Sequence, residues 1–293
     1  MTIAWRTLMD DVYGSPIVLS PSEITADRLN VAPDIRSEIL ENSYIACAGM
    51  VSDGVIDTIN SEFETKFPDQ EKPDFDVSPS DIIAYSFLSV SVVYGYSFQQ
   101  NPNPFRFSNS AGEEKKVRSF GLGFSSITNE ETLSQVGYYA FRNEMGYVVD
   151  LDMSSSPYQV LLCKCELQDT IENTLEMIEL NMSTTVEELH DEDTLVVPEI
   201  NFQDEHIYEE LLGKIILNAG FEGYYIREAK QKTQFRLDKN GASVSSEAQI
   251  VQTLSEKKYL TFKNPFLVIM KKRGSHLPFF VMWVDNAQFM KRF

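Results

Sequence analysis

The chain has few of the residues from which catalytic or metal sites are built. Its 293 residues include only three histidines and three cysteines. His190, His206 and His276 lie far apart in sequence, and no His-Glu-x-x-His motif, glycine-rich phosphate loop or Gly-x-Ser-x-Gly elbow accompanies them. Cys163 and Cys165 stand close together inside an apolar run with no second pair elsewhere, which does not fit a zinc site. We therefore expect no enzymatic activity, no metal or other cofactor, and reduced cysteines.

Basic residues are also scarce. The chain has 25 Lys and Arg against 44 Asp and Glu, a formal net charge of −19. Nucleic acids and anionic membranes need a basic face, so we expect neither as a partner. The excess of acidic residues is compatible with a basic protein partner, although such an excess more often reflects an acidic solvated surface. The acidic cluster Glu187–Asp193 has a spacing that fits no calcium loop, and we interpret it as a solvated turn.

Long apolar runs are absent too. No run approaches the roughly 18 residues that a membrane helix needs, and the first residues, MTIAWRTLMDDVYG, lack the basic start and unbroken apolar segment of a signal peptide. The prediction is a cytoplasmic protein, or a secreted one if it is processed or exported by another route. Only in that second case would Asn181, in an Asn-Met-Ser sequon, become a glycosylation site.

What the sequence has in quantity is apolar and aromatic residues that favour strands. It is 43% hydrophobic, with 13 tyrosines and 19 phenylalanines, enough for a real core. Ile82–Phe98 is the most strand-prone run and predicts one long buried strand. Helices are expected at residues 1–14, at Ser52–Phe67 with Ser52 or Asp53 as its cap, at Thr170–Leu180 and at His206–Asn218. Ser15–Ser22 predicts a short strand leading to a helix capped by Ser20 with Pro21 as its first residue.

The C-terminal part has a definite order of segments. An alternating stretch, Lys232–Leu237, is followed by the turn Asp238–Gly241 and a long polar run. Two apolar runs then follow, Phe262–Met270 and Leu277–Val284, and the turn residues 271–275 join them. The pattern predicts strand, loop, strand, turn, strand. A loop of about twenty residues is unusual in a compact domain, and this loop is where we expect the function to lie.

These segments resemble the C-terminal end of the serpin family. The similarity is carried by QKTQFRLDKNGASVSSEAQ, FKNPFLVIM and PFFVMWVDN, in this order, and by SPIVLSPSEI near the start. It covers residues 15–24 and most of 80–293, and implies an α+β fold with mixed and antiparallel sheets A, B and C and surrounding helices. We expect a single domain over 1–293, with a divergent, shortened helical part at 1–80 and a β-rich core at 81–293 that carries an exposed loop, 241–261. Ile82–Phe98 and Lys232–Leu237 would both belong to sheet A.

The resemblance also implies a mechanism, in which a protease cuts the exposed loop and the cut loop inserts into sheet A as a new strand. The expected partner is a protease or another protein, and the chain is expected to be a monomer. The scissile bond would be Leu254–Ser255, with Lys257 and Lys258 as alternatives in another register. The alternative function is a non-inhibitory binding or structural module of the same fold. The loop would swing at a hinge formed by Gly241, Ala242, Ser243, Val244, Ser245 and Ser246.

Overall fold

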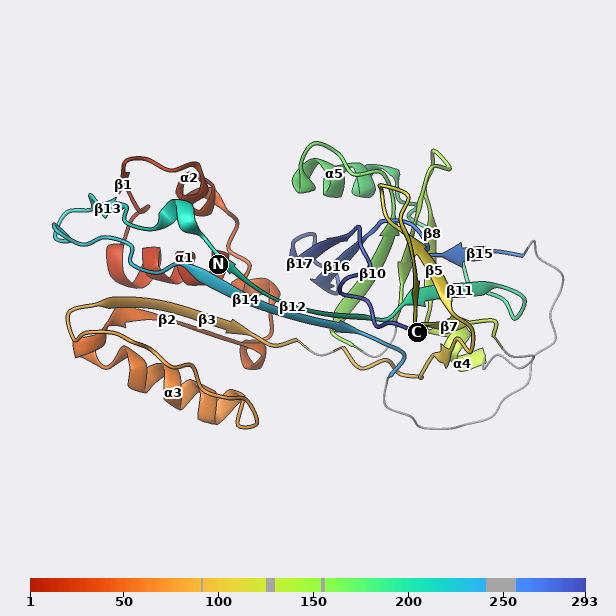
Figure 1. The fold of residues 1–293 in the computed structure, drawn as a ribbon, viewed down its shortest axis with the longest axis horizontal. Helices are drawn as coiled ribbons and strands as arrows, with labels where there is room; N and C mark the ends of the chain where they lie inside the picture. The colour runs from red at the N-terminus through yellow and green to blue at the C-terminus, as the bar shows by residue number, and fades with distance from the viewer. Residues whose placement is uncertain (91, 125–129, 154–155, 241–256) are drawn as a thin grey trace. The chain divides into compact units, whose positions relative to one another are not determined.

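The computed structural model describes residues 1–90, 92–124, 130–153, 156–240 and 257–293 (Figure 1). The chain forms two compact units, residues 1–90 with 204–233, and residues 91–203 with 234–293. It passes between them after Val90 and within two strands, β12 (Ile200–Ile207) and β14 (Lys230–Leu237). These two strands pair with each other in a two-stranded sheet.

The first unit is organised around an antiparallel pair of strands, β2 (Tyr44–Met50) and β3 (Ile82–Leu88). The helix α3 (Val55–Lys66) packs Val55, Ile59 and Phe63 against this pair, because residues at that spacing share one side of a helix. Figure 1 shows α1 on the opposite face of the pair from α3. The other elements of this unit are α1 (Thr2–Leu8), the π-helical turn η1 (Met9–Tyr13), β1 (Leu19–Ser20), α2 (Ile24–Val31), the 3-10 turns η2 (Arg36–Glu38), η3 (Glu41–Ser43), η4 (Val51–Asp53) and η5 (Glu209–Leu211), and β13 (Ile215–Ile216).

The second unit contains the two largest described sheets. One has the strand order β17-β16-β10-β9-β8, and the other β15-β11-β7-β4. A separate hairpin pairs β5 with β6. The elements are β4 (Gln99–Gln100), β5 (Phe105–Ser108), β6 (Glu114–Val117), β7 (Ser119–Leu122), α4 (Glu130–Ser134), β8 (Gly137–Ala140), β9 (Tyr147–Asp150), β10 (Tyr158–Lys164), α5 (Ile171–Asn181), β11 (Thr194–Pro198), β15 (Tyr259–Thr261), β16 (Phe266–Lys272) and β17 (Pro278–Val284).

The C-terminal order of segments is confirmed. β16 and β17 are antiparallel neighbours, and β16 is buried from Phe266 to Met270. In β14 the side chains of Phe235 and Leu237 are buried, as the alternation predicts, and the Phe235 ring stacks on Phe280 with ring centroids 4.9 Å apart. The amphipathic helix at 170–180 is also confirmed as α5, where the Thr170 side chain accepts a hydrogen bond from the Asn173 N–H.

The prediction of one long strand over Ile82–Phe98 is wrong. β3 ends at Leu88, where its partner β2 begins at Tyr44, and the chain beyond has no strand partner of comparable length. β3 pairs with β2 and β14 pairs with β12, so the two strands expected to share sheet A lie in different described sheets.

Three other local predictions are also wrong. The segment expected to be a helix at His206–Asn218 holds the end of β12, the turn η5 and the two-residue strand β13. α3 begins after Gly54, in a left-handed conformation with φ of 86°, and neither Ser52 nor Asp53 caps it. The helix after β1 begins at Ile24 with Glu23 at its N-cap rather than at Pro21. The chain therefore turns for three residues after β1 before its helix can start. The three cysteines are free as expected, but only Cys163 is buried.

An ion pair between the buried Asp150 and the partly exposed Arg273 joins β9 to the turn between β16 and β17, and it predicts a pH effect. Asp150 is fully buried, and its carboxylate accepts from Gln159 Nε2 at 2.9 Å and lies 3.4 Å from Arg273 Nη1. Burial raises the pKa of Asp150, against the opposing effect of Gln159, the Asp152 N–H and Arg273.

A carboxyl whose pKa rises on folding costs stability when ionised, and this cost disappears as the pH falls through its folded pKa. We expect wild type to gain unfolding free energy relative to Asp150→Asn as the pH is lowered from 7, measured by urea denaturation. A difference that shrinks with falling pH would contradict this.

Candidate functional site

The predicted hinge, Gly241 to Ser246, and the predicted scissile residues Leu254 and Ser255 lie outside the described residues. What the structure does describe is how the chain is held on either side of 241–256. Both ends belong to the second unit, as the last part of β14 and as β15. These two anchors form the candidate site.

The first anchor is the end of β14. The N–H of Phe98 donates to the carbonyl of Lys239 at 3.0 Å, so the chain just past the strand is tied to the segment before β4. The Asp238 carboxylate accepts from Arg236 Nε at 2.6 Å and from the Asn240 N–H at 2.8 Å. Asp238 thus closes a local turn over the two residues that precede Gly241.

Aromatic residues pack around Phe98, which bonds to this anchor. The Phe98 ring packs between Tyr94 and Phe120, with centroids 5.1 and 5.6 Å away. All three side chains are buried, and burial, together with the nearby Asp238 carboxylate, raises the pKa of Tyr94 well above its ordinary range. The buried Gln135 amide exchanges two hydrogen bonds with the Tyr96 backbone, at 2.7 and 2.9 Å, which fixes the path of this segment.

The second anchor is β15, which pairs in parallel with β11. Asp193, immediately before β11, is only 1% exposed, and its two carboxylate oxygens accept from the N–H of Lys258 at 2.6 Å and of His190 at 2.9 Å. The Thr194 N–H donates to the Lys258 carbonyl at 3.0 Å. Lys258 is therefore held on both sides of its peptide, and the chain is fixed as it enters β15.

The Lys258 side chain is engaged as well. Its ammonium lies 3.3 Å from Glu187 Oε2 and 5.4 Å from the centroid of the Tyr138 ring. The side chain of Lys257, by contrast, is exposed and reaches over the ring of Tyr259. The interpretation of Glu187–Asp193 as a solvated turn is therefore wrong at its end, since Asp193 is buried and holds the second anchor.

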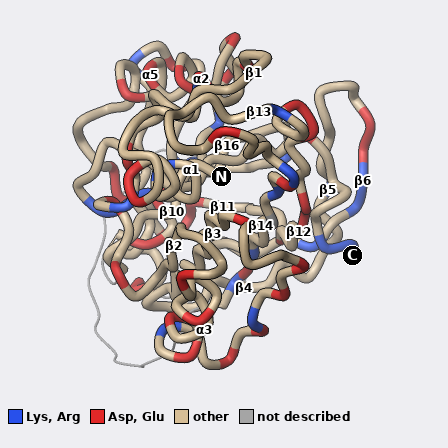
Figure 2. The backbone as a smooth tube through the Cα atoms, turned by 90° about the vertical axis from the view of Figure 1, so that its left-hand side faces the viewer, with Lys and Arg blue, Asp and Glu red and all other residues tan. Residues whose placement is uncertain are grey.

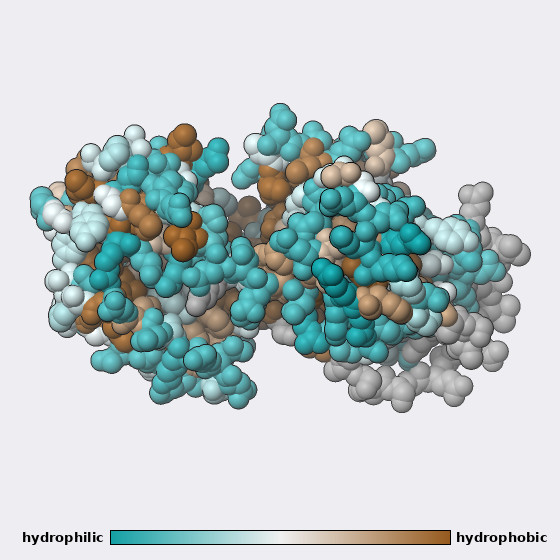
Figure 3. All heavy atoms as spheres, in the orientation of Figure 1, coloured by the Kyte–Doolittle hydropathy of each residue, from teal (hydrophilic) through white to brown (hydrophobic). Residues whose placement is uncertain are grey.

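The remaining residues considered from sequence do not gather at this site. Asn181 is the last residue of α5, and its amide nitrogen donates to the Met177 carbonyl at 2.9 Å. Among the residues that the structure describes, no group of three or more His, Cys, Asp or Glu could hold a metal ion. None of the described helices has the length and apolar character needed to cross a membrane. On the face shown in Figure 3, hydrophilic residues are interspersed with small apolar patches.

No family model and no curated protein matches this sequence. The fold, however, is similar to solved structures. Uncleaved ovalbumin matches with a TM-score of 0.57 at 12% identity, over 97% of this chain and 91% of the other. Native protease nexin-1 with heparin matches with a TM-score of 0.50 at 13% identity, over 79% of this chain, and the match spans only 65% of that protein's chain. A thermophilic serpin, tengpin, matches at 0.49 and 14% identity, over 84% and 70%. At such identities the likeness concerns the fold.

Proposed function

Starting from the serpin-like α+β fold of this chain, we propose that it acts on a protease through residues 241–256, as a suicide-type inhibitor whose cut segment adds to the sheet as a new strand. The chain itself carries out no catalytic turnover in this proposal. The protease cuts one bond and is trapped as an acyl-enzyme while the freed segment inserts.

The observation that carries the proposal is the position of β14. It leads directly into the predicted hinge at Gly241, and β12 is its only strand neighbour among the described residues. A strand with one free edge can accept another, because its unpaired N–H and C=O groups match those of an extended chain. The Phe98–Lys239 backbone bond at the end of β14 would have to open first, at a cost of about 1 kcal/mol, which a ladder of new bonds would exceed.

The order of side chains in 241–256 supports one register of insertion. Counted from Gly241, alternate residues are small or apolar, and the charged Glu247 falls in the outward set. A slip by one residue would bury Glu247 and is therefore disfavoured. The inward residues would be Ala242, Val244, Ser246, Ala248 and Ile250.

The second anchor bears on where the cut falls. A protease needs an extended segment that it can enclose, whereas Lys258 is bound through its N–H, its carbonyl and its ammonium. This disfavours Lys258 as the cleaved residue and leaves Leu254–Ser255 as the proposed bond, with Lys257 as the nearer alternative. A Leu at the cut suits a protease with an apolar pocket.

A second candidate, a binding module of this fold without insertion, is favoured by a specific observation. The resemblance implies one sheet that contains both β3 and β14. In the described part of the chain these two strands lie in separate sheets. In such a module, a protease or other protein would recognise the segment, and cleavage would have no further consequence.

The two candidates give different results with a chymotrypsin- or elastase-like protease. For the trap we expect an SDS-resistant band at the summed mass, and a cleaved chain that melts at least several degrees higher, because a new strand adds hydrogen bonds and burial. Clean cleavage with no such band and no rise in Tm would exclude the trap and leave the binding module.

A matched pair of substitutions tests the register. Val244→Asp would place a charge on the inward face and is expected to abolish the SDS-resistant band while leaving cleavage intact. Ser245→Asp places the same charge one residue along, on the outward face, and is expected to keep the band. Equal behaviour of the two variants would contradict the proposed register.

A further inference from the structure

The strand β2 has one edge that no described strand covers. It pairs with β3 along all seven of its residues, and the two form a sheet of only two strands. This feature belongs to the first unit and does not depend on the function proposed above.

The register shows which backbone groups face that edge. At the two ends of the ladder, the Ser89 N–H donates to the Ser43 carbonyl and the Val51 N–H to the Asp81 carbonyl, both at 2.9 Å. Hydrogen-bonded and non-bonded residues alternate along an antiparallel pair, so the odd-numbered residues of β2 bond to β3. The even-numbered residues, among them Ala46 and Ala48, therefore turn their N–H and C=O groups away from β3.

Most of these outward groups are unused. The Tyr44 carbonyl accepts from Lys66 Nζ at 3.3 Å, whereas the backbone groups of Ala46 and Ala48 have no partner among the described residues. Proteins commonly protect a free strand edge with charge, proline, a bulge or a covering segment. The edge of β2 has none of the first three, since its sequence is YIACAGM and its ladder to β3 is regular.

An open groove runs along this edge, with a volume of about 400 Å³. Ala46–Met50 form its floor, Asp11 lies on the η1 side, and Asp53, Val55 and Thr58 lie on the α3 side. Ala46 and Ala48 have small side chains and Gly49 has none, and all three residues are partly exposed in the groove.

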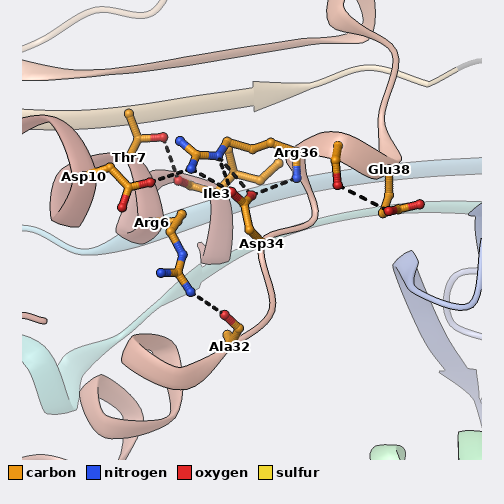
Figure 4. Close-up of polar contacts among 9 residues, drawn as sticks. Ile3, Arg6, Thr7, Asp10, Ala32, Asp34, Arg36 and Glu38 are labelled. Carbon is orange, nitrogen blue, oxygen red and sulfur yellow. Dashed lines mark hydrogen bonds and ion pairs between the residues drawn. The ribbon is translucent and has the colours of Figure 1, made fainter.

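The η1 side of the groove is held in place by two ion pairs and a hydrogen bond. Arg36 bonds to both Asp10 and Asp34, and Arg6 donates to the Ala32 carbonyl (Figure 4). These contacts link the chain at 32–36 to α1 and η1, so that Asp11, the next residue after Asp10, is presented from a fixed turn.

The groove is acidic. Asp11 and Asp53 are both exposed and make no ion pair within the described part of the chain. Burial raises the pKa of the Cys47 thiol on the floor of the groove, and Glu62 and Asp11 raise it further, against the effect of Lys66. Figure 2 shows acidic positions, in red, along the neighbouring helix α3.

We propose that the free edge of β2 binds an extended, basic segment of a partner protein, which adds to the β2–β3 pair as a third strand. Main-chain bonds to Ala46 and Ala48 supply the affinity, and the rim carboxylates select for Lys or Arg. A second copy of this chain is a poor occupant, because Asp11 and Asp53 of both copies would be brought together and each copy carries a net charge of −19.

The alternation of β2 also sets the pattern of the added strand. Ile45 and Cys47 face α3, where they pack in its hydrophobic cluster, so residues of the partner on that side meet Val55 and Thr58. Residues on the other side meet Asp11. The fitting segment therefore places Lys or Arg on the Asp11 side and small apolar residues opposite Val55 and Thr58, with one further basic residue beside Asp53 at the end of β2.

A peptide that alternates Lys or Arg with Val, capped at both ends, is the probe for this edge. We expect it to bind the full chain in fluorescence anisotropy and to slow amide hydrogen exchange at Ala46 and Ala48. The double variant Asp11→Lys/Asp53→Lys is expected to weaken binding about tenfold or more at low salt. The double variant Glu166→Lys/Asp169→Lys, at two exposed positions in the second unit, makes the same change in net charge and is expected to leave binding unchanged.

A further variant tests the main-chain contacts. Ala48→Pro removes an N–H that the fold does not use, so we expect an unchanged melting curve and binding at least about tenfold weaker. The proposal is overturned if a peptide with Glu in place of the basic residues binds equally well, if the probe does not bind, or if Ala48→Pro folds and binds as wild type does. It is also overturned if sedimentation shows the chain dimerising with Ala46 and Ala48 protected, which would assign the edge to a second copy.

Discussion

Gly121→Ala is expected to lower the free energy of unfolding by roughly 4 kcal/mol or more, one of the largest effects available from a single methyl group in this chain. Gly121 lies in β7 with φ of 149°, and a Cβ there would lie 1.8 Å from the carbonyl oxygen of Leu195. The obstacle is the backbone of the neighbouring strand β11, which pairs with β7 through Val196 and Gly121. No side-chain rotation can relieve such a contact, so the two strands would have to separate.

The measurement is equilibrium denaturation in urea, with Gly112→Ala as the matched control. Gly112 also has a positive φ, of 80°, but a Cβ there meets nothing within 4 Å. The control is expected to cost only the roughly 1 kcal/mol of a left-handed alanine. If the two variants lose similar amounts of stability, the close approach of β7 to β11 is not the cause.

Gly121 also shows where a sequence stops being informative. Its neighbourhood, Gly-Leu-Gly, is too short to indicate any phosphate-binding loop, and nothing local to it predicts a strand that must lie against another backbone. That requirement comes from β11, some seventy residues later in the chain. By contrast, β16, β17 and α5 were predictable, because each carries its own signal of periodicity and bounding turns.

Two of the wrong predictions share a cause, which is that pairing with a distant segment decides where a strand ends. Ile82–Phe98 has the composition of a strand throughout, but β2 supplies a ladder only as far as the Tyr44–Leu88 pair. In the same way, β12 continues to Ile207 beside β14, where the local pattern of charged and apolar residues had indicated the start of a helix. Local propensity is overridden in both places by pairing with a distant segment.

At the candidate site, sequence reasoning located the segment but missed the residue that holds one of its ends. The resemblance in 231–286 indicated where the loop begins and ends. Asp193 was grouped with neighbouring acidic residues, because a carboxylate gives no local sign that it will be buried. Its burial depends on the N–H of Lys258, 65 residues away in the chain, which fixes the geometry only after folding.

Asp193→Ala is accordingly expected to destabilise the protein by about 3 kcal/mol and to loosen the second anchor. Asp193 is 1% exposed, so its removal leaves the N–H groups of Lys258 and His190 without their acceptors, and each buried unpaired donor costs about 1–3 kcal/mol. Asp193→Asn keeps one acceptor oxygen in place and should lose clearly less. We expect faster amide exchange at Lys258 and Thr194 in the Ala variant, because the bond between these two residues depends on the same turn.

Amide exchange at individual sites and the loss of unfolding free energy together distinguish a loosened anchor from general instability. If Asp193 acts through the anchor, exchange in the Ala variant rises at β15 and β11 more than at α3, which packs in the hydrophobic cluster of the first unit. A uniform rise at all sites, or equal losses of stability for the Ala and Asn variants, would contradict the role assigned to its two hydrogen bonds.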